Sequence, residues 1–171
     1  KTLSTSFSNM RKGAAAIGRI EEILNTPVTV DDNPNGKLLP AFTDKIEFRN
    51  VQFAYEDVVI LDDINLTIEK GKTVALVGSS GAGKSTLADL VPRFHDVTSG
   101  EVLIDGVNIK DYSLSSIRNL MSIVTQEPIL FNDTIGNNIA LGQQGATQQQ
   151  IEEAARIANA HAFILKKEDG Y

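Results

Sequence analysis

The stretch GSSGAGKST, from Gly78 to Thr86, decides the fold of this 171-residue chain. It matches the spacing G-x-x-x-x-G-K-[ST] through Gly78, Gly83, Lys84 and Ser85. In a loop of this spacing, successive backbone N–H groups and the N-terminus of the following helix face one anion. Glycine is needed where the main chain approaches phosphates or takes a positive φ, because a Cβ would obstruct it. The motif predicts a loop that holds the phosphate chain of a nucleotide.

Two side chains of this loop have predicted tasks. Lys84 reaches the β- and γ-phosphates as a point charge, and the Ser85 hydroxyl ligates Mg²⁺. The alternative is a glycine-rich turn without a ligand, which is disfavoured because a chance match in a chain this long has a frequency of about one per cent or below. The residues predicted to contact the nucleotide are Gly78, Ser79, Ser80, Gly81, Ala82, Gly83, Lys84, Ser85 and Thr86.

The residues around the loop alternate between strand and helix patterns. TVALVG (73–78) is a continuous apolar run typical of a strand buried on both faces, and MSIVTQ (121–126) is a second such run. STLADLVPRF (85–94), which follows the loop, has a helical composition. SLSSIRNLM (113–121) predicts a short helix capped by Ser113 or a neighbouring residue. This alternation indicates the α/β class, with the phosphate loop between a buried strand and a helix.

Three further stretches predict strands, and two of them have a half-buried pattern. KIEFRNVQFAY (45–55) alternates apolar and polar residues, with one slip such as a bulge, and INLTIEKGK (64–72) places its apolar side chains on one face. GEVLIDG (100–106) also predicts a strand. The first two strands suit a sheet that is covered on one side.

Helical patterns occupy both ends of the chain. Residues 4–24 place apolar side chains at spacings of three and four, which predicts one helix that ends before Pro27. VTVDDNPNGKLLPAFTD (28–44) is rich in turn-forming residues and is interpreted as a linker. NDTIGNNIALG (132–142) and TQQQIEEAARIANAHAFILKK (147–167) predict helices, the second capped by its first threonine.

The composition limits what the chain binds. A net charge of −6 and a pI of about 4.9 argue against a nucleic-acid partner, which would need a basic stripe. The chain has no cysteine, which excludes disulfides and thiolate metal sites. No stretch approaches the roughly 18 unbroken apolar residues of a membrane span, so the chain itself is expected to be soluble. His95 and His161 are interpreted as surface or helix-packing residues.

A hydrolytic site also needs a carboxylate that holds Mg²⁺ and a group that orients the attacking water. Asp105 follows three apolar residues, but the glycine after it favours an Asp-Gly hairpin turn over a metal ligand. Asp62 and Asp63 are interpreted as turn carboxylates. No apolar run after Gln126 ends in Asp-Glu, so the part of the site that handles water is expected to lie outside this chain.

Three stretches carry a resemblance to a known family. They are IEFRNVQFAY (46–55), LDDINLTIEKGKTVALVGSSGAGKSTLADLVPRFHDVTSGEVLIDGVNI (61–109) and IVTQEPILFNDTIGNNIALG (123–142). Together they resemble the first part of an ABC transporter ATP-binding domain, over residues 45–171. The likeness is greatest to exporters with the membrane domain fused ahead, such as bacterial lipid A and multidrug exporters. It implies a P-loop NTPase core with an antiparallel β subdomain and part of a helical subdomain, preceded by an N-terminal helix.

The resemblance assigns roles to three residues outside the loop. Tyr55 matches the aromatic residue that stacks on adenine in this family, and Ile60 is expected to touch the base. Gln126 matches the glutamine that approaches Mg²⁺ and the attacking water, in a loop that senses the membrane domain. The resemblance therefore implies that Lys84 and Gln126 serve catalysis, and that Ser85 and Gln126 serve the Mg²⁺ site. The implied cofactors are ATP and Mg²⁺.

Partners and location follow from the same resemblance. ABC domains hydrolyse ATP as head-to-tail dimers, so we expect a second nucleotide-binding domain, identical or different, and a fused transmembrane domain. Residues 1–27 are expected to end the last transmembrane-domain helix, 28–44 to form the linker and 45–171 to begin the nucleotide-binding domain. The parent protein is expected at the cytoplasmic face of the cell membrane. The LSGGQ signature, the Asp-Glu strand and the switch histidine of the family do not occur here, so the chain is expected to bind ATP and hydrolyse it poorly.

Two alternatives share the phosphate loop. A soluble P-loop kinase would not explain Tyr55 or the stretch TQEPILF (125–131), and phosphate transfer to a small acceptor would favour it. A non-hydrolysing nucleotide-binding regulator would bind ATP without a fused membrane domain. The stretch that precedes this chain in the parent gene would distinguish that regulator from an exporter.

Overall fold

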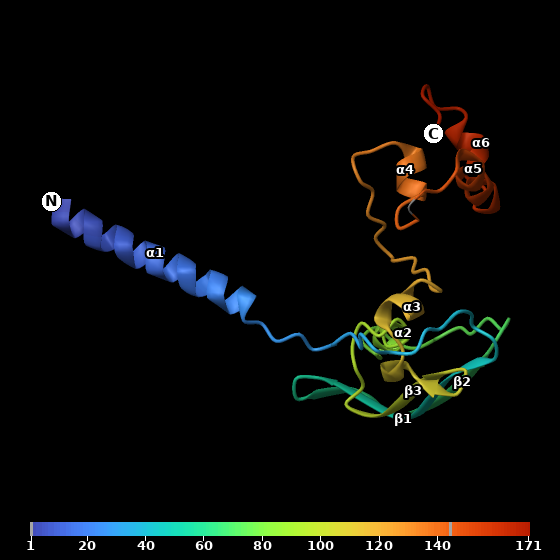
Figure 1. Cartoon of the computed structure of the whole chain (residues 1–171), viewed down its shortest axis with the longest axis horizontal. Coiled ribbons are helices and arrows are strands. Elements are labelled where there is room, and N and C mark those ends of the chain that lie inside the picture. The colour runs from blue at the N-terminus through green and yellow to red at the C-terminus, as the bar shows by residue number, and fades with distance from the viewer. Residues whose placement is uncertain (1, 144) are drawn as a thin grey trace. The chain divides into compact units, whose positions relative to one another are not determined.

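The computed structural model describes residues 2–143 and 145–171 of the chain (Figure 1). These residues fall into two compact units that divide between Ser122 and Ile123. The first unit holds an antiparallel sheet and the phosphate loop, and the second holds three short helices.

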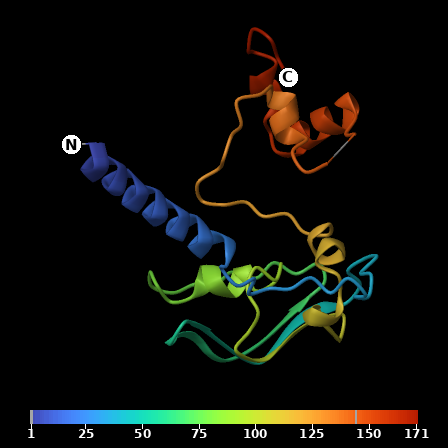
Figure 2. The same ribbon diagram turned by 60° about the vertical axis from the view of Figure 1, so that its left-hand side comes forward.

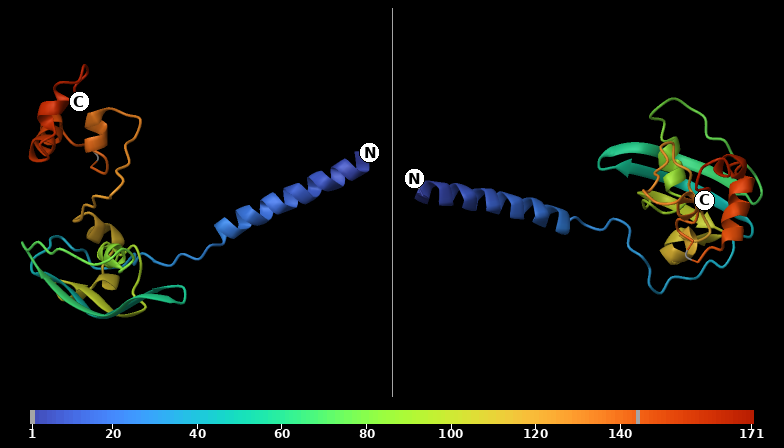
Figure 3. Two further views of the ribbon diagram at one scale, coloured as in Figure 1. Left: turned by 180° about the vertical axis from the view of Figure 1, so that it is seen from behind. Right: turned by 90° about the horizontal axis from the view of Figure 1, so that it is seen from above.

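Helix α1 (Thr2–Leu24) confirms the helix predicted for residues 4–24 and is continuous in every view (Figures 1 and 3). It ends before Pro27, which has no N–H group for a further helical hydrogen bond. Its large apolar side chains from Met10 onward are more than half exposed. In the part of the chain that the structure describes, no helix combines the length and the apolar character that crossing a bilayer requires.

The first unit contains a four-stranded antiparallel sheet in the order β2-β1-β3-β4. Its strands are β1 (Lys45–Tyr55), β2 (Val58–Glu69), β3 (Ser99–Ile104) and β4 (Val107–Asn108). The three predicted strands are thereby confirmed. The pairing of β1 with β2 shifts in register between Phe48 and Val51, where the single predicted slip falls, and again between Val51 and Phe53 and between Phe53 and Ala54.

The pairing of the strands places apolar side chains next to one another on one face of this sheet. Ile46 of β1 lies opposite both Ile68 and Ile104, and Phe48 lies opposite Leu66. Because successive side chains of a strand point to opposite faces, Ile46 and Phe48 share a face. That face carries the core of the unit.

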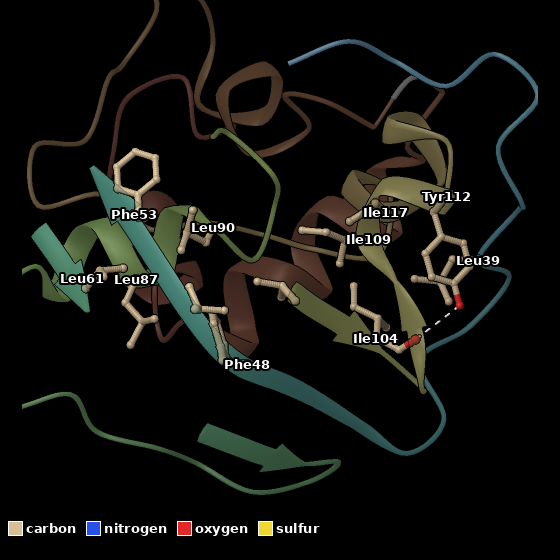
Figure 4. Packing of buried hydrophobic residues seen from close by; sticks show 12 residues of the cluster. Leu39, Phe48, Phe53, Leu61, Leu87, Leu90, Ile104, Ile109, Tyr112 and Ile117 are labelled. Carbon is tan, nitrogen blue, oxygen red and sulfur yellow. Dashed lines mark hydrogen bonds between the residues drawn. The ribbon is translucent and has the colours of Figure 1, made fainter. Parts of the chain in front are cut away.

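Two short helices, α2 (Lys84–Asp89) and α3 (Leu114–Arg118), lie on the same side of the sheet (Figures 1 and 2). Helix α3 has a side-chain cap as predicted, and the structure identifies the capping residue as Ser113. Between the sheet and these helices pack Leu39, Phe48, Val51, Phe53, Leu61, Leu87, Leu90, Val102, Ile104, Ile109, Tyr112 and Ile117 (Figure 4). The chain between β4 and α3 adds a 3-10 turn, η1 (Ile109–Asp111).

Helix α2 is shorter than the helical stretch predicted for residues 85–94. It ends at Asp89, and residues 90–94 form turns. Pro92 explains the early end, because proline lacks a donor and disfavours helical backbone at the residue before it.

From Asp32 onward, the segment interpreted as a linker is hydrogen-bonded to the rest of the first unit. The Leu114 N–H donates to the Asp32 carboxylate at 2.8 Å. The Lys37 N–H donates to the Asp111 carbonyl at 2.8 Å, and the Ser113 N–H donates to the Lys37 carbonyl at 3.0 Å. Residues 32–44 therefore form a strap that is hydrogen-bonded to the rest of the first unit.

The turn between β3 and β4 confirms the predicted Asp-Gly hairpin. Asp105 and Gly106 have φ values of 52° and 79°, as in a type I′ turn. The Asp105 carboxylate accepts from the backbone N–H groups of Thr43, Asp44 and Lys45 and from the Thr43 hydroxyl, at 2.7 to 3.1 Å. Partial burial raises the pKa of Asp105, but these hydrogen bonds outweigh it and hold the pKa below its usual value.

The prediction that Asp62 and Asp63 lie in a turn is wrong. Both belong to β2, where Asp63 has a φ of 48° in an irregular part of the pairing with β1. The Gln52 side-chain amide donates to Asp62 at 2.9 Å, and the Asn50 amide donates to Asp63 at 3.0 Å. A bulge therefore places two adjacent carboxylates inside a strand, which the alternating pattern does not anticipate.

The two strands predicted as buried on both faces are not formed. Residues 73–78 and 121–126 have no strand assignment, and the described part of the chain contains only the four-stranded sheet. Val77 and Val124 are 89% and 96% exposed. An apolar run indicates a need for burial, but a strand forms only where a neighbour accepts its backbone hydrogen bonds.

The second unit consists of α4 (Ile135–Ile139), α5 (Gln148–Ile157) and α6 (His161–Ile164). Thr147 caps α5 as predicted, because its hydroxyl accepts from the Gln150 N–H while the Gln150 side chain accepts from the Thr147 N–H. The single helix predicted for residues 147–167 is in fact two helices. Asn159 takes a left-handed φ of 56° after α5, which interrupts the helical path.

Candidate nucleotide-binding site

The phosphate loop leads directly into α2, and two of its glycines take left-handed backbone conformations. Gly81 and Gly83 have φ values of 81° and 77°, a region that side chains rarely adopt. At Gly83 a Cβ would also lie 2.8 Å from Leu61 Cδ2 and 3.0 Å from Ile60 Cγ2. Glycine is therefore required at position 83 both for the backbone conformation and for the close approach of the loop to β2.

The first turn of α2 offers backbone donors that no side chain caps. Gly83 is the N-cap residue and has no side chain to accept a hydrogen bond. The N–H groups of a helix's first turn have no acceptor within the helix. Such donors, next to a glycine-rich loop, suit an anion with several oxygen atoms. The residues present therefore fit the phosphate chain of a nucleotide.

Lys84 places the positive charge of the motif inside the loop. Its Nζ donates to the Gly78 carbonyl at 3.0 Å and to the Ser79 carbonyl at 2.7 Å. An ammonium group has three donor protons, so one remains for a further acceptor. The lysine therefore braces the loop and still has a proton to donate to a phosphate oxygen.

The remaining residues of the motif differ in exposure. Ser85 is exposed, which leaves its hydroxyl accessible to a ligand, whereas Thr86 is buried beside Leu87. The Ala82 N–H donates to the Ser79 carbonyl at 3.3 Å and closes a turn. Ser85 thus has the exposure that metal ligation requires, and Thr86 packs against the core.

Tyr55 and Ile60, predicted to contact the base, lie at the hairpin end of β1 and β2. Tyr55 is the last residue of β1, lies opposite Val58 and is 43% exposed. Its ring meets the buried Phe53 ring edge to face, with centroids 4.8 Å apart and an interplanar angle of 88°. Ile60 lies against Gly83 of the loop. An accessible aromatic ring and the phosphate loop therefore belong to the same unit.

Gln126 is not part of the first unit, which contains the phosphate loop. It belongs to the second unit and is exposed in an irregular segment. The first unit therefore contains every residue predicted to contact the nucleotide, and the assignment of Gln126 to Mg²⁺ and the attacking water stays a prediction.

One neighbour of the site was not found from the sequence. His95, interpreted from the sequence as a surface or helix-packing residue, contacts Tyr55, with ring centroids 5.3 Å apart and an interplanar angle of 88°. The two residues are 40 positions apart, on a strand and in a loop. No periodic pattern or motif spacing connects them, so only the fold reveals the contact.

A glycine-rich loop packed on a strand, an uncapped helix start and a lysine within the loop define a P-loop nucleotide-binding domain. The model of the family described as ABC transporter matches residues 61–169 of the chain. An ATP-dependent lipid A-core flippase of Syntrophus aciditrophicus (strain SB) is 48% identical over 171 residues, which are 100% of this chain and 28% of that protein. Protein YgaD of Bacillus subtilis (strain 168), whose name describes a multidrug export ATP-binding/permease protein, is 44% identical over 173 residues, 100% of this chain and 30% of its own length.

A solved structure gives the same result. It is described as a bacterial Atm1-family ABC exporter with ATP bound, and it matches with a TM-score of 0.83 and 38% identity over 99% of this chain and 30% of that chain. The chain belongs to the ABC transporter family. The predicted α/β class with a P-loop core is confirmed by this match. The chain spans 28% to 30% of the length of these proteins.

Proposed function

We propose that this chain binds MgATP and begins the nucleotide-binding domain of an ATP-driven exporter at the cytoplasmic face of the cell membrane. Residues 1–27 are assigned to the end of the last transmembrane-domain helix, 28–44 to the linker and 45–171 to the nucleotide-binding domain. A second nucleotide-binding domain in a head-to-tail pair and a fused membrane domain are the proposed partners. The names of the relatives, which refer to lipid A-core flipping and multidrug export, support this proposal.

The observation that carries the proposal is the loop around Lys84. Gly83 lies in close contact with Ile60 and Leu61, and the helix that follows has no side-chain cap. The Lys84 ammonium lies among the loop carbonyls. Backbone donors and one positive charge therefore gather at one point, which is what a triphosphate requires.

In the proposed complex, the chain's own residues bind and orient the nucleotide. Lys84 reaches oxygens of the β- and γ-phosphates, and Ser85 offers its hydroxyl to Mg²⁺. When bound, Mg²⁺ neutralises charge on the phosphates. Tyr55 stacks on adenine and Ile60 touches the base, so that the two ends of the nucleotide are held by different elements.

Gln126 is assigned to Mg²⁺ and the attacking water, on the family resemblance. We expect slow turnover by the chain alone, because no apolar run after Gln126 ends in the Asp-Glu pair that would supply the missing carboxylate. Phosphate release by the purified chain is the measurement. Steady release at the rate of a complete ABC domain would contradict this part of the proposal.

Calorimetric titration with MgATP tests the binding directly, and it suits a chain without tryptophan. We expect Lys84→Ala to weaken binding at least about tenfold, because hydrogen bonds to charged groups are worth about 1.5 to 3 kcal/mol. Lys110→Ala is the matched control, since Lys110 is an exposed lysine of η1 in the same unit. This control is expected to bind as the unmodified chain does.

Two results would contradict the proposal. The first is a folded chain, with helical circular dichroism, that gives no heat of binding with MgATP. The second is equal affinity in the unmodified chain and in Lys84→Ala. Transfer of phosphate from ATP to a small acceptor would instead indicate a kinase.

A further inference from the structure

His95 lies against the aromatic end of the proposed nucleotide site. Its ring centroid is 5.3 Å from that of Tyr55, at an interplanar angle of 88°, and 5.4 Å from that of Phe53. Its Nε2 is 3.4 Å from the Tyr55 hydroxyl. Phe53 is buried on β1 (Figure 4) and meets Tyr55 from the same strand. Two neighbouring rings therefore hold the ring of Tyr55, and one of them is His95.

Backbone hydrogen bonds fix the loop that carries His95 onto β1. The Thr98 N–H donates to the Gln52 carbonyl at 2.9 Å, and the Thr98 hydroxyl accepts from the Ala54 N–H at 3.2 Å. Gln52 and Ala54 flank Phe53 in the sequence of β1. The loop after α2 therefore runs beside β1 at Phe53.

Two arginines anchor the other side of this loop. Arg93 is buried, and its Nε donates to the Asp96 carboxylate at 2.7 Å. Arg118 of α3 donates to the carbonyls of Pro92 and Arg93 at 3.0 and 2.8 Å. His95 lies between these bonded residues in the sequence, so its backbone is held on both sides.

We propose that His95 is a positioning residue for the base end of the nucleotide. Its edge-to-face contact holds the Tyr55 ring in the orientation that receives adenine, an inference that rests on the proposed function. A tyrosine at the end of a strand, 43% exposed, has several staggered rotamers open to it. A ring that is ordered before the ligand arrives loses less conformational entropy on binding. His95 therefore raises the affinity for the base without touching the phosphates.

The same short segment connects the two ends of the proposed site. Helix α2 begins at Lys84, and the loop that follows it carries His95. Leu87 and Leu90 are buried in the core and hold this segment against the sheet. Lys84 acts on phosphates and His95 on the ring of Tyr55, so a ligand that lacks a base separates their effects.

The experiment compares two ligands, MgATP and the magnesium complex of inorganic triphosphate, by calorimetry on the 171-residue chain. We expect His95→Ala to weaken MgATP binding about three- to tenfold, the range of an aromatic pair. Binding of the triphosphate is expected to stay unchanged, because that ligand has no base for Tyr55 to receive. A variant that damages the fold would weaken the binding of both ligands.

Two further variants identify the contact. His95→Phe keeps the ring contact and loses the hydrogen bond, and we expect it to recover most of the MgATP affinity because a 3.4 Å bond is weak. His161→Ala is the matched control, since His161 also pairs with a tyrosine, Tyr171, but in the second unit. It is expected to leave both affinities unchanged.

A double variant tests whether His95 acts through Tyr55. In a Tyr55→Ala background, His95→Ala is expected to cause no additional loss of MgATP affinity, since the ring that it positions is gone. Independent losses that multiply in the double variant would overturn the inference.

Three other results would also overturn it. They are unchanged MgATP affinity in His95→Ala, an equal loss for both ligands, and a His95→Phe variant as weak as His95→Ala. Each leaves the proposed function standing, provided that Lys84→Ala has lost binding. An unmodified chain that fails to bind MgATP would overturn both proposals.

Discussion

The antiparallel sheet and the two unpaired apolar runs have similar apolar content, yet they differ in burial. Val51 of β1 is fully buried, whereas Val77 and Val124 are almost fully exposed. Strand β1 finds its partner in β2 across a short turn, because antiparallel neighbours need only a hairpin. A strand of a parallel sheet needs crossover connections and neighbours on both sides. Apolar content therefore indicates where burial is needed, and available partners decide whether a strand forms.

The same substitution in both regions gives the largest contrast. Val51→Ala is expected to lower the free energy of unfolding by about 2 to 3 kcal/mol, because it removes two buried methyl groups and leaves a cavity. Val124→Ala, at a position that is 96% exposed, is expected to change it by less than about 0.5 kcal/mol. Urea unfolding followed by circular dichroism measures both values. Similar losses in the two variants would mean that the run at 121–126 is buried in solution.

Gly83 tests the junction between the phosphate loop and the paired strands. Gly83→Ala combines an unfavourable φ with a contact of 2.8 Å to Leu61, so we expect a loss of about 2 kcal/mol or more in the free energy of unfolding. Gly81→Ala has the same strained φ but meets no atom within 4 Å, and it is expected to lose about 1 kcal/mol. Equal losses would show that the close approach of the loop to β2 contributes nothing.

Asp105 tests how firmly the strap is bonded to the hairpin. Asp105→Asn weakens charge-assisted hydrogen bonds from Thr43, Asp44 and Lys45, so we expect a loss of about 1 to 2 kcal/mol at pH 7. Asp57→Asn, at an exposed carboxylate in the β1–β2 turn, is the control and is expected to lose less than about 0.5 kcal/mol. Urea midpoints compare the three proteins.

The pH dependence of stability follows from the direction of the Asp105 pKa shift. Burial raises the pKa of Asp105, but the hydrogen bonds to its carboxylate lower it by more. The net pKa therefore lies below the usual 3.8. The ionised carboxylate therefore stabilises the fold fully above about pH 5, and this contribution is lost as the pH falls through the folded-state pKa. Asp105→Asn is expected to lack this acid-dependent loss. An identical pH profile in the variant would contradict the bonding described here.

Local rules predicted much of this fold. The alternation in residues 45–55 predicted β1 and its bulge, and the Asp-Gly pair predicted the turn at Asp105. Caps at Thr147 and at Ser113 or a neighbouring residue are predictable because a hydroxyl before a helical pattern satisfies the first donors of the helix. These features depend on a few neighbouring residues, so the sequence contains all that determines them.

Features that depend on distant residues were not predictable in this way. Residues 73–78 and 121–126 have strand patterns, but their state depends on which neighbours pair with them. The contact of His95 with Tyr55 depends on a loop that hydrogen bonds place beside β1. The motif spacing predicted the phosphate loop, and the packing of Gly83 on β2 emerged only from the fold.

Amide hydrogen exchange with and without saturating MgATP tests the central claim most directly. The account predicts slower exchange at residues 78–86, whose backbone donors are proposed to bind the phosphates, and unchanged exchange at the β3–β4 hairpin turn. Unchanged exchange at residues 78–86, or equal slowing in both places, would contradict the assignment of this loop as the phosphate-binding element.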